Sequence, residues 1–294
     1  MKPAPFEYYV PDSIEQALDL MREHGDSAKL LAGGQSLVPA LNFRVVETKV
    51  LIDLNRVEEL RYIREAGDVL QVGAMIRERE LEFDPVISKK TPLLAEVMPY
   101  IAHPQIRNRG TLGGSLANAD PAAELPVIML TLGARLRVSK AGGERWVDAT
   151  NFFTGMFTTD LASDEMLVEI ELPALQPRTG WSFMEVAPRA GDYALMGVAA
   201  LVVLAEDGRC KRARLVYLNA GDGPMDARQA ANSLEGVIPN ADAIEGAADL
   251  ASREEINPFG NIHASPDFQR HLARILTRKT LQQAAERAHQ EDMA

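Results

Sequence analysis

Two glycine pairs about eighty residues apart are the part of this sequence best suited to chemistry with a ligand. Each is predicted to form a loop, one made of Ala32, Gly33, Gly34, Gln35, Ser36 and Leu37 and the other of Thr111, Leu112, Gly113, Gly114 and Ser115. Glycines allow positive φ and bring backbone N–H groups close to a ligand, and a neighbouring hydroxyl can cap a helix or donate to an oxygen. Because backbone amides and helix N-termini bind phosphate, the two segments predict a site for a ligand with two phosphates. The alternative interpretation is that they are two unrelated tight turns.

The usual nucleotide-binding signatures are missing from the chain. Neither G-x-G-x-x-G nor G-x-x-x-x-G-K-[ST] occurs in the 294 residues. This argues against a Rossmann NAD site and against a P-loop NTPase. If a dinucleotide binds this chain, we expect it to bind in another fold.

Composition narrows the class of protein further. A length of 294 residues predicts two domains with a sizeable core, and a net charge of -11 argues against nucleic-acid and anionic-membrane partners. Cys210 is the only cysteine, so the chain can form no internal disulfide and cannot ligate an Fe–S cluster. The five histidines lack metal-ligand spacing, and we expect a packing or loop role for His103 and no metal site.

The sequence shows no targeting pattern and no segment typical of a transmembrane helix. Its first residues lack an apolar h-region, and its longest apolar run, 193–205, includes a glycine and is too short to cross a bilayer. A buried strand is expected for that run. We therefore expect a cytoplasmic protein without an integral membrane segment.

The elements that would position the glycine segments mix helix and strand patterns. Apolar residues recur at helical spacing after Ser13 and stop at Gly25. The first glycine segment follows a strand-like run at 28–31 and precedes a helix-like stretch at 37–44. Further strands are expected at 49–53, 69–74, 135–138 and 168–172, and helices at 92–100 and 122–132.

A linker pattern at 175–180, with two turn-forming residues and no periodicity, divides the chain. After it the sequence predicts strands at 181–187, 197–205 and 212–220, then helices at 226–234, 241–251 and 266–288. We therefore expect an α+β fold of two domains. Residues 1–176 would form two subdomains with a glycine segment in each, and residues 177–294 a smaller antiparallel sheet followed by helices.

With the glycine segments placed, the sequence resembles the FAD-binding (medium) subunits of the molybdenum hydroxylases. That family includes aerobic carbon monoxide dehydrogenase, xanthine dehydrogenase and bacterial N-heterocycle dehydrogenases. The resemblance runs from about residue 6 to 288 and is carried by the motifs at 32–39, 104–115, 119–124 and 189–194. The second motif, Pro-Gln-Ile-Arg-Asn-Arg-Gly-Thr-Leu-Gly-Gly-Ser, is highly specific. The resemblance implies a two-part flavin domain of the vanillyl-alcohol oxidase (PCMH) type, followed by a smaller C-terminal α+β domain.

The same resemblance implies where non-covalent FAD would touch the chain. Both glycine segments would cradle its diphosphate. The other implied contacts are Ile101, Ala102, Asn118, Asp120, Glu124, Val168 and Tyr193. Ile101 and Ala102 would act through their backbone, Glu124 would hold a polar part of the cofactor, and the strand near Val168 would run along the flavin. Tyr193 would stack on the isoalloxazine ring, with a core or edge-strand tyrosine as the alternative.

Partners are implied as well. In this family the molybdenum cofactor lies on a large subunit and two [2Fe–2S] clusters on a small one, and we expect a heterohexamer with these two subunits. Electrons would pass from the clusters through FAD to NAD, a quinone, oxygen or another acceptor. That step needs no acid or base from the chain, so no catalytic residue is expected. A self-standing flavin-dependent reductase of the same fold and a flavin-less scaffold subunit stay open as alternatives.

Overall fold

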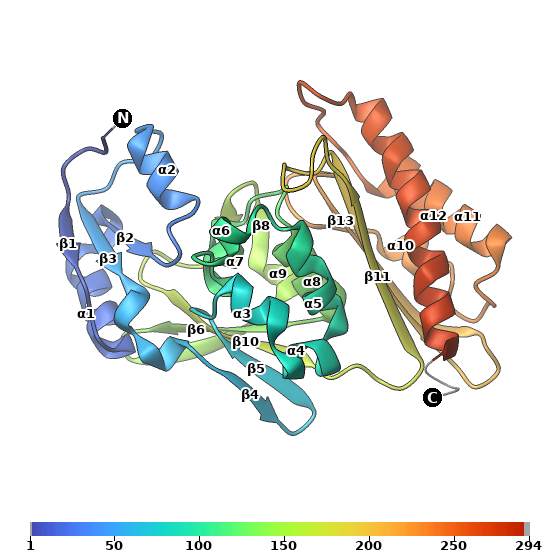
Figure 1. Ribbon diagram of the computed structural model, residues 1–294, viewed down its shortest axis with the longest axis horizontal. Helices are drawn as coiled ribbons and strands as arrows, with labels where there is room; N and C mark the ends of the chain where they lie inside the picture. The colour runs from blue at the N-terminus through green and yellow to red at the C-terminus, as the bar shows by residue number, and fades with distance from the viewer. Residues whose placement is uncertain (1, 291–294) are drawn as a thin grey trace.

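The computed structural model describes residues 2–290 and shows three parts in a row (Figure 1). The N-terminal part is a parallel sheet in the order β1 (Glu7–Tyr9), β3 (Val50–Asp53), β2 (Ala28–Leu31). Helix α1 (Ile14–His24) packs its apolar face on β3, as its helical spacing predicts. The turn after β2 leads into α2 (Leu37–Asn42).

The central part is built on a five-stranded antiparallel sheet with short helices packed against it. Its strand order is β4 (Ile63–Ala66), β5 (Val69–Gly73), β10 (Met166–Pro173), β6 (Arg135–Lys140), β7 (Gly143–Asp148). The helices are α3 (Glu78–Phe83), α4 (Pro85–Lys90), α5 (Pro92–Val97), α6 (Pro104–Arg107), α7 (Leu112–Asn118), α8 (Glu124–Leu132) and α9 (Ala149–Phe152), and a hairpin joins β8 (Phe153–Gly155) to β9 (Thr158–Thr159). All residues of α8 are buried, because α8 lies in the core between this part and the C-terminal part.

The C-terminal part is an antiparallel sheet with helices on its outer face (Figure 1). The strands are β11 (Thr179–Val186), β12 (Met196–Leu204), β13 (Cys210–Leu218) and β14 (Met225–Asp226), and the helices are α10 (Arg228–Asn232), α11 (Ala241–Leu250) and α12 (Pro266–Gln290). Alternate residues of β12 and β13 enter different cores, one shared with the central part and one under α10–α12. Both faces of β12 are therefore covered, which explains its continuous apolar run.

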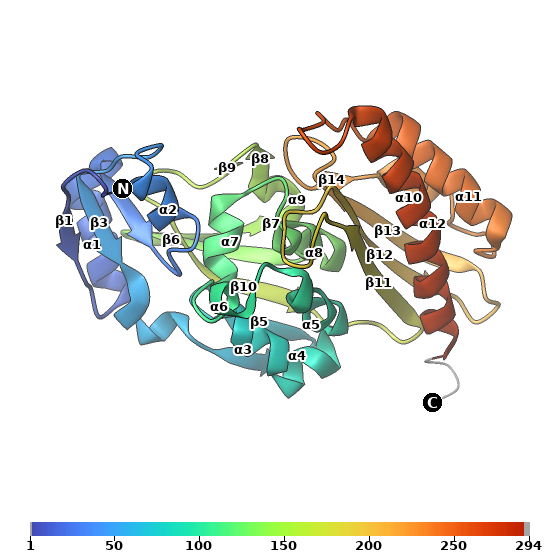
Figure 2. The same ribbon diagram turned by 45° about the horizontal axis from the view of Figure 1, so that its top comes forward.

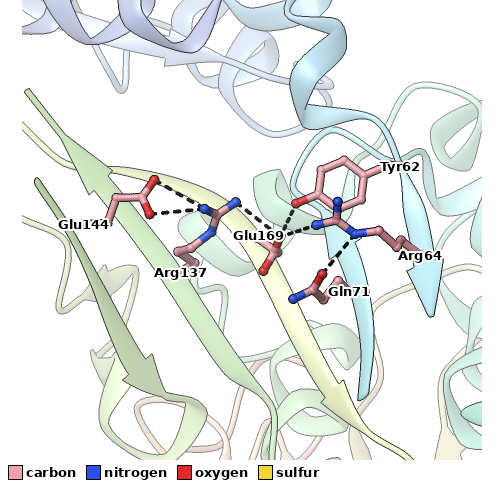
Figure 3. A network of polar contacts seen from close by, with 6 residues as sticks. All are labelled: Tyr62, Arg64, Gln71, Arg137, Glu144 and Glu169. Carbon is pink, nitrogen blue, oxygen red and sulfur yellow. Dashed lines mark hydrogen bonds and ion pairs between the residues drawn. The ribbon is translucent and has the colours of Figure 1, made fainter. Parts of the chain in front are cut away.

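A polar network fixes β10 within the central sheet (Figure 3). The Glu169 carboxylate is 2% exposed and accepts hydrogen bonds from the Tyr62 hydroxyl and, at 3.2 Å, from Arg137 Nη2. Arg64 lies 3.7 Å from the same carboxylate. Burial and this hydrogen bond to Glu169 raise the pKa of Tyr62 to about 12. Because these residues come from both sides of β10, the network holds the neighbouring strands in register.

Most of the expected elements are confirmed, with four local corrections. Segment 111–115, expected as a loop, supplies the N-cap and first turns of α7, because Leu112 and Leu116 are both fully buried on one helix face. Strand β11 begins inside the expected linker. The expected helix at 226–234 is divided between β14 and the shorter α10, and that at 92–100 ends as a 3₁₀ turn at Met98–Tyr100. Within residues 2–290 no helix is long and apolar enough to cross a membrane.

Candidate functional site

The two glycine segments lie directly against each other. A Cβ on Gly33 would lie 2.8 Å from Gly110 Cα and closer still to the carbonyl oxygen of Arg109. A Cβ on Gly114 would lie 3.3 Å from Ala32 Cβ. The missing side chains therefore let segment 32–36 and the residues around 109–114 close onto one place.

The first segment offers free backbone donors. Gly34 has a φ of +75°, a left-handed conformation that favours glycine. Within the described part of the chain, the N–H groups of Gly33, Gly34 and Gln35 donate no hydrogen bond, whereas Gln35 Nε2 donates to Gly33 O at 3.0 Å. A pocket of about 300 Å³ opens beside them, lined by Leu31, Ala32, Gly33, Gly34, Gln35, Val38, Pro39, Asp53, Asn55 and Arg109. Unused amides at a glycine turn suit an anionic oxygen.

The second segment is organised differently. Gly113 N–H donates to Ala74 O at 2.8 Å, and Gly114 N–H donates to Thr111 Oγ1 at 3.1 Å. A Cβ on Gly113 would lie 2.6 Å from Ala74 Cβ, so glycine is needed there for close packing against Ala74, the residue that follows β5. The amide of Gly113 is therefore used within the protein, and the buried Thr111 hydroxyl caps α7. The side-chain group that this segment presents is the partly exposed hydroxyl of Ser115.

Arg77 joins the two segments and has no counterpart among the residues expected from the sequence. Its guanidinium donates to Arg109 O and to Asn55 Oδ1. Asn55 Nδ2 in turn donates to Ala32 O at 3.0 Å. Burial lowers the pKa of Arg77, with the nearby Arg109 adding to this effect. The N-terminal and central parts are thus tied together beside the glycines.

The backbone at Ile101 and Ala102 is held in an unusual shape by a buried arginine. Ala102 has a φ of +43°, which a residue with a side chain rarely adopts. Arg107, 5% exposed, donates to Ile101 O at 2.8 Å and to Ala102 O at 3.2 Å, and pairs with Glu82 at 3.0 Å. Gly191 packs here too, since a Cβ on it would lie 3.0 Å from Ala102 O. Loop 189–193 of the C-terminal part therefore meets the backbone at 101–102.

Asn118, Asp120 and Tyr193 lie at the far end of α7. Asn118 is the last residue of this helix, and Asp120 Oδ1 accepts a hydrogen bond from Ala122 N–H at 2.9 Å. Tyr193 is 71% exposed and lies close enough to Asp120 for that carboxylate to help raise its pKa. The glycine pair at 113–114 lies in the first turn of α7, so about 6–8 Å of helix separates it from Asn118. Figure 2 shows α7 between the N-terminal and C-terminal sheets.

Two buried carboxyl groups of the central part, Glu78 and Glu124, lie close enough to the half-buried Glu185 of β11 for Glu124 to influence both of the others. Burial raises the pKa of Glu124 to about 7. Burial, reinforced by the charge of Glu124, raises the pKa of Glu78 to about 7 and that of Glu185 to about 8. One carboxyl oxygen of Glu78 and one of Glu185 are buried without a hydrogen-bond partner among residues 2–290. These groups are therefore partly protonated near neutral pH and can act as hydrogen-bond donors.

Val168 contributes through its backbone. Its side chain is 1% exposed and lies in the core between the N-terminal and central parts. Its carbonyl oxygen accepts a hydrogen bond from Ala74 N–H at 3.0 Å, and Ala74 O accepts from Gly113. The backbone of β10 is thus linked through Ala74 to the second glycine segment. Taken together, the residues expected to bind the cofactor lie toward the two ends of α7.

Comparison with known proteins defines the family. Residues 4–175 match the profile described as FAD binding domain in molybdopterin dehydrogenase, and residues 181–284 match CO dehydrogenase flavoprotein C-terminal domain. The 6-hydroxypseudooxynicotine dehydrogenase complex subunit alpha of Paenarthrobacter nicotinovorans is 41% identical over 98% of this chain and 97% of its own. The carbon monoxide dehydrogenase medium chain of Hydrogenophaga pseudoflava is 35% identical over 97% of this chain and 98% of its own.

Solved structures agree with this assignment. Carbon monoxide dehydrogenase from Hydrogenophaga pseudoflava has a TM-score of 0.95 at 35% identity, covering 98% of this chain and 99% of that one. Quinoline 2-oxidoreductase from Pseudomonas putida 86 has a TM-score of 0.92 at 39% identity, with the same coverage. Fold and site therefore define a flavoprotein subunit of an oxidoreductase. The chain belongs to the family of FAD-binding medium subunits of molybdenum hydroxylases, so the expected family, fold and FAD cofactor are confirmed.

Proposed function

We propose that FAD lies along α7, with its diphosphate at the two glycine segments and its isoalloxazine ring at the Asp120–Tyr193 end. The unused amides of segment 32–36 carry this proposal, because they are donors that only a ligand or water can satisfy. The hydroxyl of Ser115 would add a contact to the diphosphate, and Thr111 would act by capping α7. The residues present fit FAD, since they combine an anion-binding turn, the length of α7 and an exposed aromatic ring beyond the end of that helix.

We infer that the remaining expected contacts act at the flavin end. Ile101 and Ala102 would present backbone held by Arg107, and Glu124 would donate a hydrogen bond from its protonated carboxyl. Asn118 and Asp120 would orient this end, with Asp120 also fixing Tyr193. When bound, FAD supplies the ability to accept electrons one at a time and release them in pairs.

We further propose that the chain is the electron-transfer subunit of a complex. It would take electrons from [2Fe–2S] clusters of a small partner and pass them to an external acceptor, while a large partner carries the molybdenum cofactor. Its single cysteine supports this, because the chain cannot hold a cluster of its own. Two relatives are named for acting on unrelated molecules, caffeine and carbon monoxide, at 37% and 35% identity to this chain. Such a range of substrates among related complexes is expected for a subunit that does not itself contact the substrate.

The test is to express the chain alone and together with its large and small partners, then assay substrate oxidation with an artificial acceptor. We expect FAD in both preparations, but substrate oxidation only in the complex, with iron and molybdenum co-purifying as a heterohexamer. Oxidation by the isolated chain at the rate of the complex would contradict the subunit assignment and favour a self-standing reductase. A folded chain that never takes up FAD would favour the flavin-less scaffold.

A further inference from the structure

A second pocket lies between the central and C-terminal parts, away from α7. It has a volume of about 180 Å³. One wall is the C-terminal end of α8 and the chain that follows β10, and the other is the inner face of the β11–β13 sheet; its lining residues are Leu132, Gly133, Pro173, Ala174, Leu175, Gln176, Thr179, Leu201, Val203, Arg212 and Arg214. A ligand in this pocket would touch both parts of the molecule at once.

The sheet wall of the pocket is cationic. Arg212 pairs with Val203 in the ladder, and Arg214 pairs with Leu201 on the same face of β13. Farther along this face, Val216 and Leu218 enter the core shared with the central part. The inner face of β13 therefore changes from apolar to doubly positive where the pocket opens.

These two arginines have no anionic partner among residues 2–290. The Arg214 guanidinium is half-buried and donates to Leu130 O at the end of α8, and burial and the nearby Arg212 lower its pKa. The carboxylate that influences Arg214, Asp226, is paired with Arg228 at 2.8 Å. Two guanidinium groups beside each other without a counter-ion leave several N–H donors unused.

A third polar group belongs to the same row of the sheet. Thr179 pairs with Val203, which pairs with Arg212, so all three lie side by side on one face. Thr179 is 1% exposed, and its hydroxyl has no hydrogen-bond partner within the described residues. A buried hydroxyl without a hydrogen-bond partner, lining a pocket that also contains two arginines, indicates a polar ligand that would form the missing hydrogen bond.

We propose that this pocket binds a small oxyanion, a phosphate or a short dicarboxylate, which bridges the two parts of the chain. The planar guanidinium fork matches the oxygens of phosphate and carboxylate groups in two-point contacts. A volume of about 180 Å³ admits such an anion and excludes a nucleotide. The site is separate from the glycine segments, so it does not depend on the proposed position of FAD.

The test uses the full chain loaded with FAD, titrated calorimetrically with sodium phosphate and, separately, with succinate, each against sodium chloride at equal ionic strength. We expect one saturable site for at least one of the two anions and a thermal midpoint that rises with its concentration. Arg212→Ala is the informative variant, because Arg212 is exposed and its side chain makes no hydrogen bond or ion pair within residues 2–290. It should weaken binding at least tenfold while leaving the anion-free midpoint unchanged.

Lys279→Ala is the matched control, since it removes one exposed positive charge on α12, on the other side of the sheet. It should leave anion binding within twofold. Binding of phosphate alone would identify a phosphate site, and binding of succinate alone a carboxylate site. The absence of saturable binding of both anions up to 10 mM, on the order of the weakest useful affinity, would overturn the proposal. Equal weakening by both variants would also overturn it, because the effect would then be one of net charge.

Discussion

Replacing Gly33 by alanine tests the contact between the two glycine segments. The added Cβ would meet backbone atoms, Gly110 Cα at 2.8 Å and the carbonyl oxygen of Arg109, which cannot rotate away. The segments can relieve this clash only by separating. Overpacking of this kind costs about 1–3 kcal/mol. If FAD requires the closed arrangement, that cost falls on FAD affinity and weakens binding by about 5- to 150-fold.

The assay is a titration of the flavin-free chain with FAD, followed by flavin fluorescence. Gly246→Ala is the matched control, because it makes the same change in α11 where nothing lies within 4 Å. This control should bind FAD like the unmodified chain and unfold at the same or a slightly higher temperature. Unchanged FAD affinity in Gly33→Ala would show that the two segments do not hold the diphosphate together.

Two further predictions concern stability. Arg107→Ala should lower the free energy of unfolding by about 1–3 kcal/mol in chemical denaturation, because it leaves the carbonyl groups of Ile101 and Ala102 without their donor and leaves Glu82 with Arg79 alone. Arg22→Ala, in an exposed pair, should cost less than about 1 kcal/mol; equal losses would contradict the role given to Arg107. The pKa of Glu185 is raised to about 8 in the folded chain, so its stabilising contribution is complete below its unfolded pKa of about 4.5 and is lost as pH rises through about 8. Glu185→Gln, measured by denaturation of the flavin-free chain from pH 5 to 9, should therefore reduce the fall in stability with pH, and an unchanged slope would refute the assignment.

Local patterns in the sequence were sufficient for most helices and strands. The apolar spacing after Ser13 and the long apolar run of β12 each correspond to an observed element. The glycine pair at 113–114 is predicted to lie in a loop but lies in α7, because the burial of Leu112 and Leu116 outweighs the low helix preference of glycine. The reason given for glycine at 113 also changes, from space for phosphate to packing on Ala74.

Long-range features of the site could not be predicted from one sequence. The bonds from Arg77 to Arg109 and Asn55 depend on how separate parts of the chain are packed, and no motif marks Arg77. The raised pKa of Glu185 depends on the burial of β11, and nothing in the neighbouring sequence indicates it. The FAD contacts named from the family, residue by residue, and the domain boundary at 176/177 both stay predictions.

The most direct measurement of the central claim is the FAD content of the purified chain. The protein is saturated with FAD, freed of excess flavin and precipitated with acid, and the flavin in the supernatant is compared with the amount of protein. We predict one FAD per chain, all of it in the supernatant, because no attachment residue is evident, and a much lower ratio for Gly33→Ala after the same treatment. A correctly folded chain that retains no flavin would contradict the account, and flavin that stays with the precipitate would contradict its non-covalent binding.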